Sequence, residues 1–150
     1  MGREIKFRGK RIDNEMGEFV YGSLFKGETA EGKQLAYIIP CGTRYEVMNG
    51  RLHRNTPLFE VDPETVGQFI WLRDSTRTKE YPEGQEIYDT DLLHNEKVLN
   101  YPVRIIFDKE LGAYMIHTQS DFLGNAVYKY HLKVFGNSHD NPELITGPQL

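Results

Sequence analysis

The sequence has almost no cysteine and no long apolar run. Its 150 residues include a single cysteine, Cys41, so no disulfide can form within the chain. No apolar run approaches the ~20 residues that a membrane-spanning helix needs. Nor does an apolar stretch follow the first four residues, as it does in a signal peptide. We therefore expect a cytoplasmic protein that does not enter a membrane, with a thiol whose role the sequence does not indicate.

Helical signals are scarce as well. Apolar residues rarely recur at a spacing of three and four. Two segments, Asp62-Pro63-Glu64 and Asn141-Pro142-Glu143, place a capping residue before a proline at the first helical position. The runs after them are too short for more than a turn or two, and residues 124–128 allow one further short helix. We expect no helix longer than about three turns.

Strand signals are frequent. Alternating apolar and polar residues, rich in aromatic and β-branched side chains, predict antiparallel strands with one solvated face. The predicted strands cover residues 4–8, 18–25, 34–39, 67–72, 86–94, 103–107, 113–117 and 128–134. The polar segment 74–84 is predicted to be a mobile loop or a boundary between two sub-regions of a single domain spanning residues 1–150.

The strongest local signal is the Asn49-Gly50 pair within residues 45–53. Both residue types tolerate the positive φ angles of a type I′ turn, whose twist matches that of two paired strands. The sequence therefore predicts a β-hairpin with Asn49 and Gly50 at its tip. The glycines at positions 17, 22 and 27 lack the strand–loop–helix context of a nucleotide-binding loop and are interpreted as turn residues.

Charge is distributed unevenly along the chain. The first eleven residues carry a local charge of +4, from the basic residues Arg3, Lys6, Arg8, Lys10 and Arg11 and the acidic Glu4. The whole chain carries −4, so the remainder carries −8. Two interpretations stay open. The cations can line the solvated face of a strand whose Ile5 and Phe7 face inward, or Lys6, Arg8, Lys10 and Arg11 can contact phosphates of a nucleic acid. The acidity of the whole chain argues against a dedicated nucleic-acid binder.

One acidic cluster has the residue types of a metal or hydrolytic site: Asp89, Asp91, His94 and Glu96. On a strand, the two aspartates would share a face and could seat a hard cation through oxygen ligands. His94 has the opposite parity, and no second cluster of matching type is visible. A solvated acidic edge that discourages strand-to-strand aggregation is therefore favoured. We expect no metal, no cofactor and no catalytic residue.

Several segments, taken in order, resemble the YopX family. They are Arg3 to Arg11, Gly17-Glu18-Phe19-Val20-Tyr21-Gly22, Val61 to Gln68, Glu86-Ile87-Tyr88 and Gly136 to Leu144. The resemblance implies a mostly β fold containing a small SH3-like or related β-barrel, an origin in a phage or prophage, and a tendency to form homo-oligomers. It implies no activity and no catalytic residues.

The sequence departs from the family pattern at three places. Trp71 stands where a small residue is expected, and residues 74–84 are longer than the usual turn. Thr90 replaces a glycine before Asp91. Trp71 can be a core residue or an exposed anchor for a partner, and the core is favoured because large aromatic side chains are highly buried on average.

Three classes of function are compatible with these observations. The first is a non-enzymatic binding module that engages nucleic acid or a host protein. The second is an assembly protein whose output is a homo-oligomer. The third is a hydrolase that uses the edge formed by Asp89 and Asp91. The sequence favours the first, because it contains no recognisable catalytic arrangement.

Overall fold

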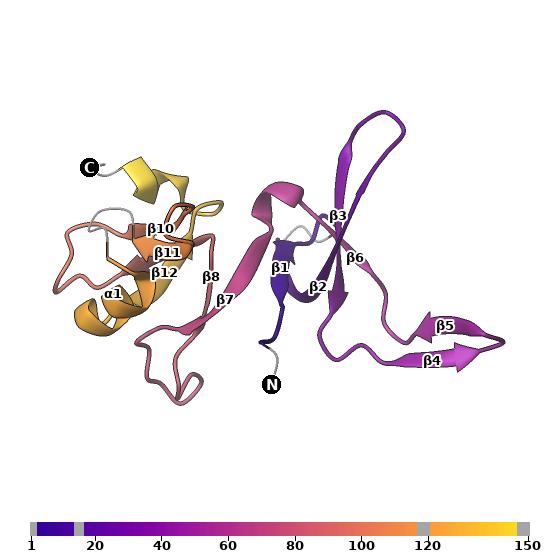
Figure 1. Cartoon of the computed structure of the whole chain (residues 1–150), viewed down its shortest axis with the longest axis horizontal. Helices are drawn as coiled ribbons and strands as arrows, with labels where there is room; N and C mark the ends of the chain where they lie inside the picture. The colour runs from indigo at the N-terminus through magenta and orange to yellow at the C-terminus, as the bar shows by residue number, and fades with distance from the viewer. Residues whose placement is uncertain (1–2, 14–16, 117–120, 147–150) are drawn as a thin grey trace. The chain divides into compact units, whose positions relative to one another are not determined.

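The computed structural model describes residues 3–13, 17–116 and 121–146 (Figure 1). The chain divides into two compact units, Met1–Gln68 and Phe69–Leu150. The division falls within strand β7, before the polar segment 74–84, which lies inside the second unit. Among the described residues, no helix is both long and apolar enough to cross a membrane.

The first unit is built from antiparallel strands. Its main sheet has the order β6 (Phe59–Val61), β3 (Gln34–Pro40), β2 (Phe19–Glu28) and β1 (Phe7–Lys10), and β1 also pairs with the start of β7 (Gly67–Arg73). A separate two-stranded sheet, β4 (Tyr45–Met48) and β5 (Arg51–Arg54), branches off between β3 and β6 (Figure 1). A short 3-10 helix, η1 (Pro63–Thr65), follows β6.

The core of the first unit is small. Ala36, Ile38 and Val61 are buried at its centre. The apolar side chains that pack around them are those of Phe7, Val20, Leu24 and Val66. The predicted cap before η1 is confirmed, because the Asp62 carboxylate accepts the Glu64 N–H at 3.0 Å. Residues of β3 and of the edge strand β6 therefore supply the buried core of the unit, and β4 and β5 supply none of it.

The expected small barrel is not found among the described residues. The strands are ordered as open sheets. Beyond β1, a single bridge joins Arg11 to Val61, and the Ile12 N–H donates to the Glu60 carbonyl at 3.2 Å. Strand β6 has only three residues and cannot extend this contact into a ladder. The prediction of a mostly β, antiparallel fold is confirmed, whereas the prediction that strands close into a small barrel is not.

The second unit combines strands with one helix. The rest of β7 pairs with β8 (Glu86–Tyr88). A four-stranded sheet has the order β11 (Ala113–Ile116), β10 (Val103–Asp108), β9 (Asp91–His94) and β12 (Lys133–Asn137). The helices are α1 (Leu123–Tyr130) and the 3-10 helix η2 (Pro142–Thr146). Ten buried residues form its core: Ile70, Ile87, Leu93, Leu99, Val103, Ile116, Leu123, Ala126, Val127 and Leu132. With eight residues, α1 agrees with the prediction of no long helix.

Two predicted strands in this unit were wrong. Residues 86–94 form two strands, β8 and β9, because a turn at Asp89 and Thr90 separates them. Residues 128–134 do not form one strand, since α1 continues to Tyr130 and β12 begins at Lys133. The alternation that predicted a strand here is coincidental, because Tyr128 is exposed while Leu132 is buried.

Trp71 lies in an irregular part of β7. The register between β7 and β8 shifts between Phe69 and Arg73, so three residues of β7 lie opposite one residue of β8. Trp71 has a φ of 62°, a left-handed conformation that costs a non-glycine residue about 1–2 kcal/mol. Its side chain is 37% exposed, so the interpretation as a core residue was wrong. The backbone conformation explains why a small residue fits this position.

Candidate binding surface

The β4–β5 hairpin is held firmly at its base. The Arg44 N–H donates to Asn55 Oδ1 at 2.9 Å, and the Asn55 N–H donates to the Arg44 carbonyl at 3.0 Å. The hydroxyls of Thr43 and Thr56 share a short hydrogen bond just below this pair. The hairpin, residues 44–54, therefore leaves the sheet as a defined arm, and we call it the arm.

The predicted turn at the tip of the arm is confirmed. Asn49 and Gly50 have φ angles of 53° and 73°, as a type I′ turn requires. The register pairs Met48 with Arg51 on either side of the turn. Because both central residues match this turn, the turn and the hydrogen bonds at the base together align the two strands.

Every residue of β4 and β5 is exposed. Side chains alternate between the two faces of a strand, and directly paired residues share a face. One face carries Tyr45, Val47 and Leu52, which are 47%, 74% and 66% exposed; we call it the apolar face. The opposite face carries Glu46, Met48, Arg51 and His53; we call it the polar face. Neither face contacts a hydrophobic core in the part of the chain that the structure describes.

The arm is basic within an acidic chain. It has three arginines, Arg44, Arg51 and Arg54, against one acidic residue, Glu46, which gives +2. Since the whole chain carries −4, the remainder carries −6. Within the described residues, the three guanidinium groups make no ion pair, so their charge is available to a partner.

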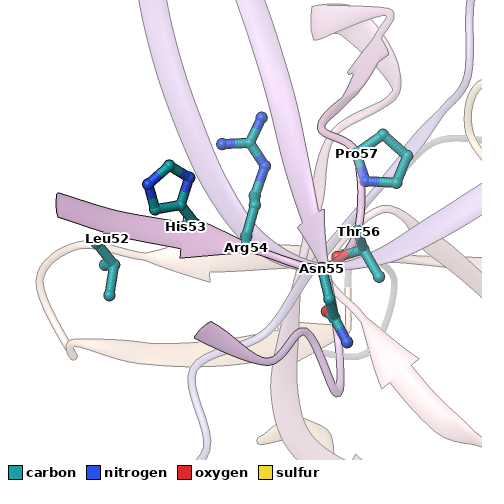
Figure 2. A pocket seen from close by; sticks show the side chains of 6 residues that line it. All are labelled: Leu52, His53, Arg54, Asn55, Thr56 and Pro57. Atoms are coloured by element: carbon teal, nitrogen blue, oxygen red, sulfur yellow. The ribbon is translucent and has the colours of Figure 1, made fainter. Parts of the chain in front are cut away.

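A hollow runs along β5 and into the segment that follows it (Figure 2). It is lined by six consecutive residues, Leu52, His53, Arg54, Asn55, Thr56 and Pro57. The imidazole, guanidinium, amide and hydroxyl groups among them are hydrogen-bonding groups that can contact phosphate oxygens or base edges. The hollow therefore adds a polar, cationic surface at the base of the arm.

The four cations of the N-terminal strand, predicted as phosphate contacts, are only partly accessible to a nucleic acid. Arg8 is 6% exposed, and its guanidinium carbon lies 4.4 Å from the centre of the Phe19 ring. Lys10 Nζ lies 5.0 Å from the same ring centre. Lys6 Nζ lies 3.7 Å from Glu4, and its side chain is largely buried. The expectation that Arg8 points into solvent was therefore wrong, because Phe19 on the neighbouring strand covers it.

Arg11 is neutralised by its neighbour. Its Nε and Nη2 donate to the two carboxylate oxygens of Asp13 at 2.9 Å and 3.1 Å. These hydrogen bonds lower the pKa of Asp13 and raise the pKa of Arg11.

Ile5, expected to be buried, is 67% exposed, whereas Phe7 packs on the core as predicted. The N-terminal strand is thus a scaffold element with reduced charge at its surface.

The acidic cluster does not assemble into a site. Asp91 is buried, and its carboxylate accepts the Tyr88 N–H at 2.7 Å. The prediction of a solvated edge was therefore wrong for Asp91. His94 packs edge-on against Phe135, with ring centres 5.2 Å apart. Among the described residues, no group of three or more histidine, cysteine or acidic residues is placed to hold a metal ion.

Sequence reasoning found the hairpin but missed its arginines as a candidate binding site. A signal was present, because three arginines and a histidine lie within eleven residues that contain one acidic residue. By charge alone the sequence favours residues 1–11, whose +4 exceeds the +2 of the arm.

The comparisons with known proteins agree with this architecture. The family model described as "YopX protein" matches residues 6–146. The chain belongs to the YopX family. No curated protein matches it. A solved structure, protein EF1440 from Enterococcus faecalis, is similar with a TM-score of 0.59 and 19% identity, over 96% of this chain and 99% of that one. At this identity the likeness shows the fold alone and carries no activity over.

Proposed function

We propose that this YopX protein is a nucleic-acid-binding module without catalysis of its own, and that the arm is its recognition element. The observation that carries the proposal is the arm's net charge of +2 on strands whose residues are all exposed. An element that packs on no hydrophobic core adds little to the stability of the fold. Its composition is therefore best explained by contact with a partner.

The dimensions of the arm suit a duplex. Four residues per strand give a ribbon about 13 Å long at roughly 3.3 Å per residue. The major groove of B-form DNA is about 12 Å wide and admits a two-stranded β-ribbon. Arg51 lies beside the tip, while Arg44 and Arg54 lie at the base. This spacing supports phosphate contacts along the whole ribbon.

Such contacts position a protein on a duplex and read little sequence. The charge of −6 on the rest of the chain opposes the approach of phosphates. We therefore expect modest affinity that falls steeply with salt. Lys6, Arg8, Lys10 and Arg11 stay in the proposal as a secondary contact, weakened by the burial of Arg8 and the pairing of Arg11.

Replacing Arg44, Arg51 and Arg54 together by alanine tests the proposal. Three phosphate contacts predict a log–log salt slope of about −3 for the unaltered chain. The triple variant should lose most of this slope and bind at least ~10-fold more weakly at about 50 mM salt. The measurement is fluorescence anisotropy of a labelled DNA duplex between about 50 and 200 mM salt.

A charge-matched control removes Lys26, Lys33 and Lys109, which are exposed cations outside the arm. This variant should keep nearly the full slope. A second control, Lys6→Ala with Lys10→Ala, separates the N-terminal strand from the arm. If the triple arginine variant and the lysine control bind alike, or if the unaltered chain does not bind, the arm is not a nucleic-acid site.

A host protein is the second candidate partner of the arm. The specific observation in its favour is the apolar face, since tyrosine and arginine are enriched in protein interfaces. Capture from infected cells with and without nuclease distinguishes the two candidates. Phage or prophage origin stays a prediction from the family resemblance, and the cytoplasmic location stays a prediction from the amino-acid sequence.

A further inference from the structure

We propose that the outer face of the main sheet of the first unit binds single-stranded nucleic acid, by stacking bases on a row of aromatic side chains. The site is separate from the arm, and the proposal does not rest on the arm's arginines. Four rings of β2 and β3 form the row, which we call the aromatic row: Phe19, Tyr21, Phe25 and Tyr37.

The register of the sheet places the four rings on one face. Phe19, Tyr21 and Phe25 are separated by even numbers of residues on β2, and Tyr37 on β3 is paired directly with Phe25. Val20, which has the opposite parity, packs on the core of the unit. In the part of the chain that the structure describes, none of the four rings belongs to a hydrophobic core. The row is therefore the uncovered side of a sheet whose other side is buried.

The rings are spaced along the sheet as two pairs. The ring centres of Phe19 and Tyr21 lie 6.3 Å apart, and Phe25 lies opposite Tyr37. In each pair one ring is well exposed, since Tyr21 is 41% and Phe25 59% exposed. These two residues lie about 13 Å apart along β2 at roughly 3.3 Å per residue. At about 3.4 Å per nucleotide, the row spans about four nucleotides. Every base has a π-face, so such stacking tolerates any sequence.

Charge favours a nucleic acid over an apolar partner on this face. The Arg8 guanidinium carbon and Lys10 Nζ both lie over the Phe19 ring, at 4.4 Å and 5.0 Å from its centre. Lys10 is the more exposed of the two cations. A base stacked on Tyr21, next to Phe19, brings its phosphates near Lys10. An apolar protein surface would instead have to remove Lys10 from water without pairing its charge.

The first unit is also less acidic than the chain as a whole. It contains ten basic and ten acidic residues, so the net charge of −4 lies entirely in the second unit. Among the described strand residues, the acidic residue that the register places on the face of the aromatic row is Glu60, on the edge strand β6. Electrostatic repulsion of a phosphate backbone is therefore small here.

Stacking rather than charge should supply most of the affinity. Each base stacked on an exposed ring is expected to contribute at least ~5-fold. For a single strand the log–log salt slope is about −0.7 per phosphate contacted. With Lys10 as the main cation we expect a slope near −1 at most, shallower than the slope of about −3 predicted for the arm on a duplex.

Fluorescence anisotropy of a labelled oligo-dT of about ten nucleotides, at about 150 mM salt, tests the proposal. Tyr21→Leu with Phe25→Leu should weaken binding at least ~20-fold, because leucine keeps the surface apolar but has no π-face. The exchange Tyr21→Phe with Phe25→Tyr keeps both rings and should bind like the unaltered chain. An oligo-U of the same length, measured in parallel, distinguishes DNA from RNA as the preferred strand.

A matched control removes two exposed rings of the second unit. Tyr101→Leu with Tyr128→Leu, at positions that are 51% and 84% exposed, should bind oligo-dT like the unaltered chain. Circular dichroism checks that each variant is folded. Ultraviolet cross-linking to oligo-dT, mapped by mass spectrometry, gives a second readout and should label Tyr21 or Phe25.

Four results would overturn the proposal: no binding of oligo-dT or oligo-U, equal binding by the double leucine variant of β2 and its parent, loss of binding in the ring-exchanged variant, or cross-links confined to the arm or the second unit. The double leucine variant of β2 should keep the parent's salt slope on a duplex. Because that slope tests the arm, either proposal can fail while the other holds.

Discussion

Replacing Asp74 by alanine is expected to destabilise the second unit by about 3–5 kcal/mol. Asp74 is a buried carboxylate that accepts four hydrogen bonds. Its Oδ1 accepts the N–H groups of Thr76 and Gln85 at 2.9 Å and 2.8 Å. Its Oδ2 accepts the Thr76 hydroxyl at 2.9 Å and the Val134 N–H at 2.7 Å. Alanine leaves these donors facing a cavity, and each buried donor without a partner costs about 1–3 kcal/mol.

Asparagine at the same position should give an intermediate loss of about 1–3 kcal/mol, because its one oxygen satisfies only part of the set. The matched control is Asp108→Ala. Asp108 also accepts two backbone N–H groups, those of Glu110 and Leu111, but at an exposed turn. Water can replace it there, so the loss should stay below about 1 kcal/mol. Urea unfolding of the three variants measures the series, and equal losses for Asp74→Ala and Asp108→Ala would contradict it.

Replacing Gly22 by alanine is expected to cost at least about 3 kcal/mol and to prevent normal folding of the first unit. Gly22 lies inside β2, between its partners Phe7 on β1 and Pro40 on β3. A Cβ atom there would lie 1.8 Å from the Ile39 carbonyl oxygen. That oxygen belongs to the backbone, so β2 and β3 would have to separate. The interpretation of Gly22 as a turn residue was therefore wrong.

Gly27 in the same strand is the matched control. A Cβ atom at Gly27 would meet nothing within 4 Å. Gly27→Ala should therefore change the unfolding free energy by less than about 0.5 kcal/mol, or stabilise the fold slightly by lowering the entropy of the unfolded chain. The yield of folded protein and thermal unfolding distinguish the two substitutions. A folded Gly22→Ala chain of normal stability would show that the close approach of β2 and β3 is absent.

The local structures that the sequence predicted correctly are determined by residues that are close together in the chain. Asn49 and Gly50 adopt the positive φ angles that their own chemistry favours, so the hairpin could be located without any tertiary contact. Asp62 caps η1 for the same reason. The order of the YopX segments along the chain identified the family, because comparing the order of residues requires no knowledge of tertiary contacts.

What the sequence did not predict depends on distant residues. The Asp74 carboxylate reaches Val134, sixty positions away, and no local pattern signals this contact. Arg8 alternates correctly with Phe7, yet Phe19 on β2 covers it. The arm shows the converse, since Tyr45 and Val47 have the pattern of a strand that packs on a core, although no core covers them. Alternation predicts a strand and its two faces but does not reveal what covers each face.

The most direct test of the central claim is to delete the arm and measure folding and binding on the same sample. Arg44 and Asn55 are already joined by two hydrogen bonds at the base, so a Gly-Gly link can replace residues 45–54, which are the whole arm except Arg44. If the arm is a recognition element outside the core, the melting temperature should stay within about 3 °C, while affinity for the labelled duplex falls at least ~10-fold. A shortened chain that binds the duplex as tightly as the parent would contradict the claim.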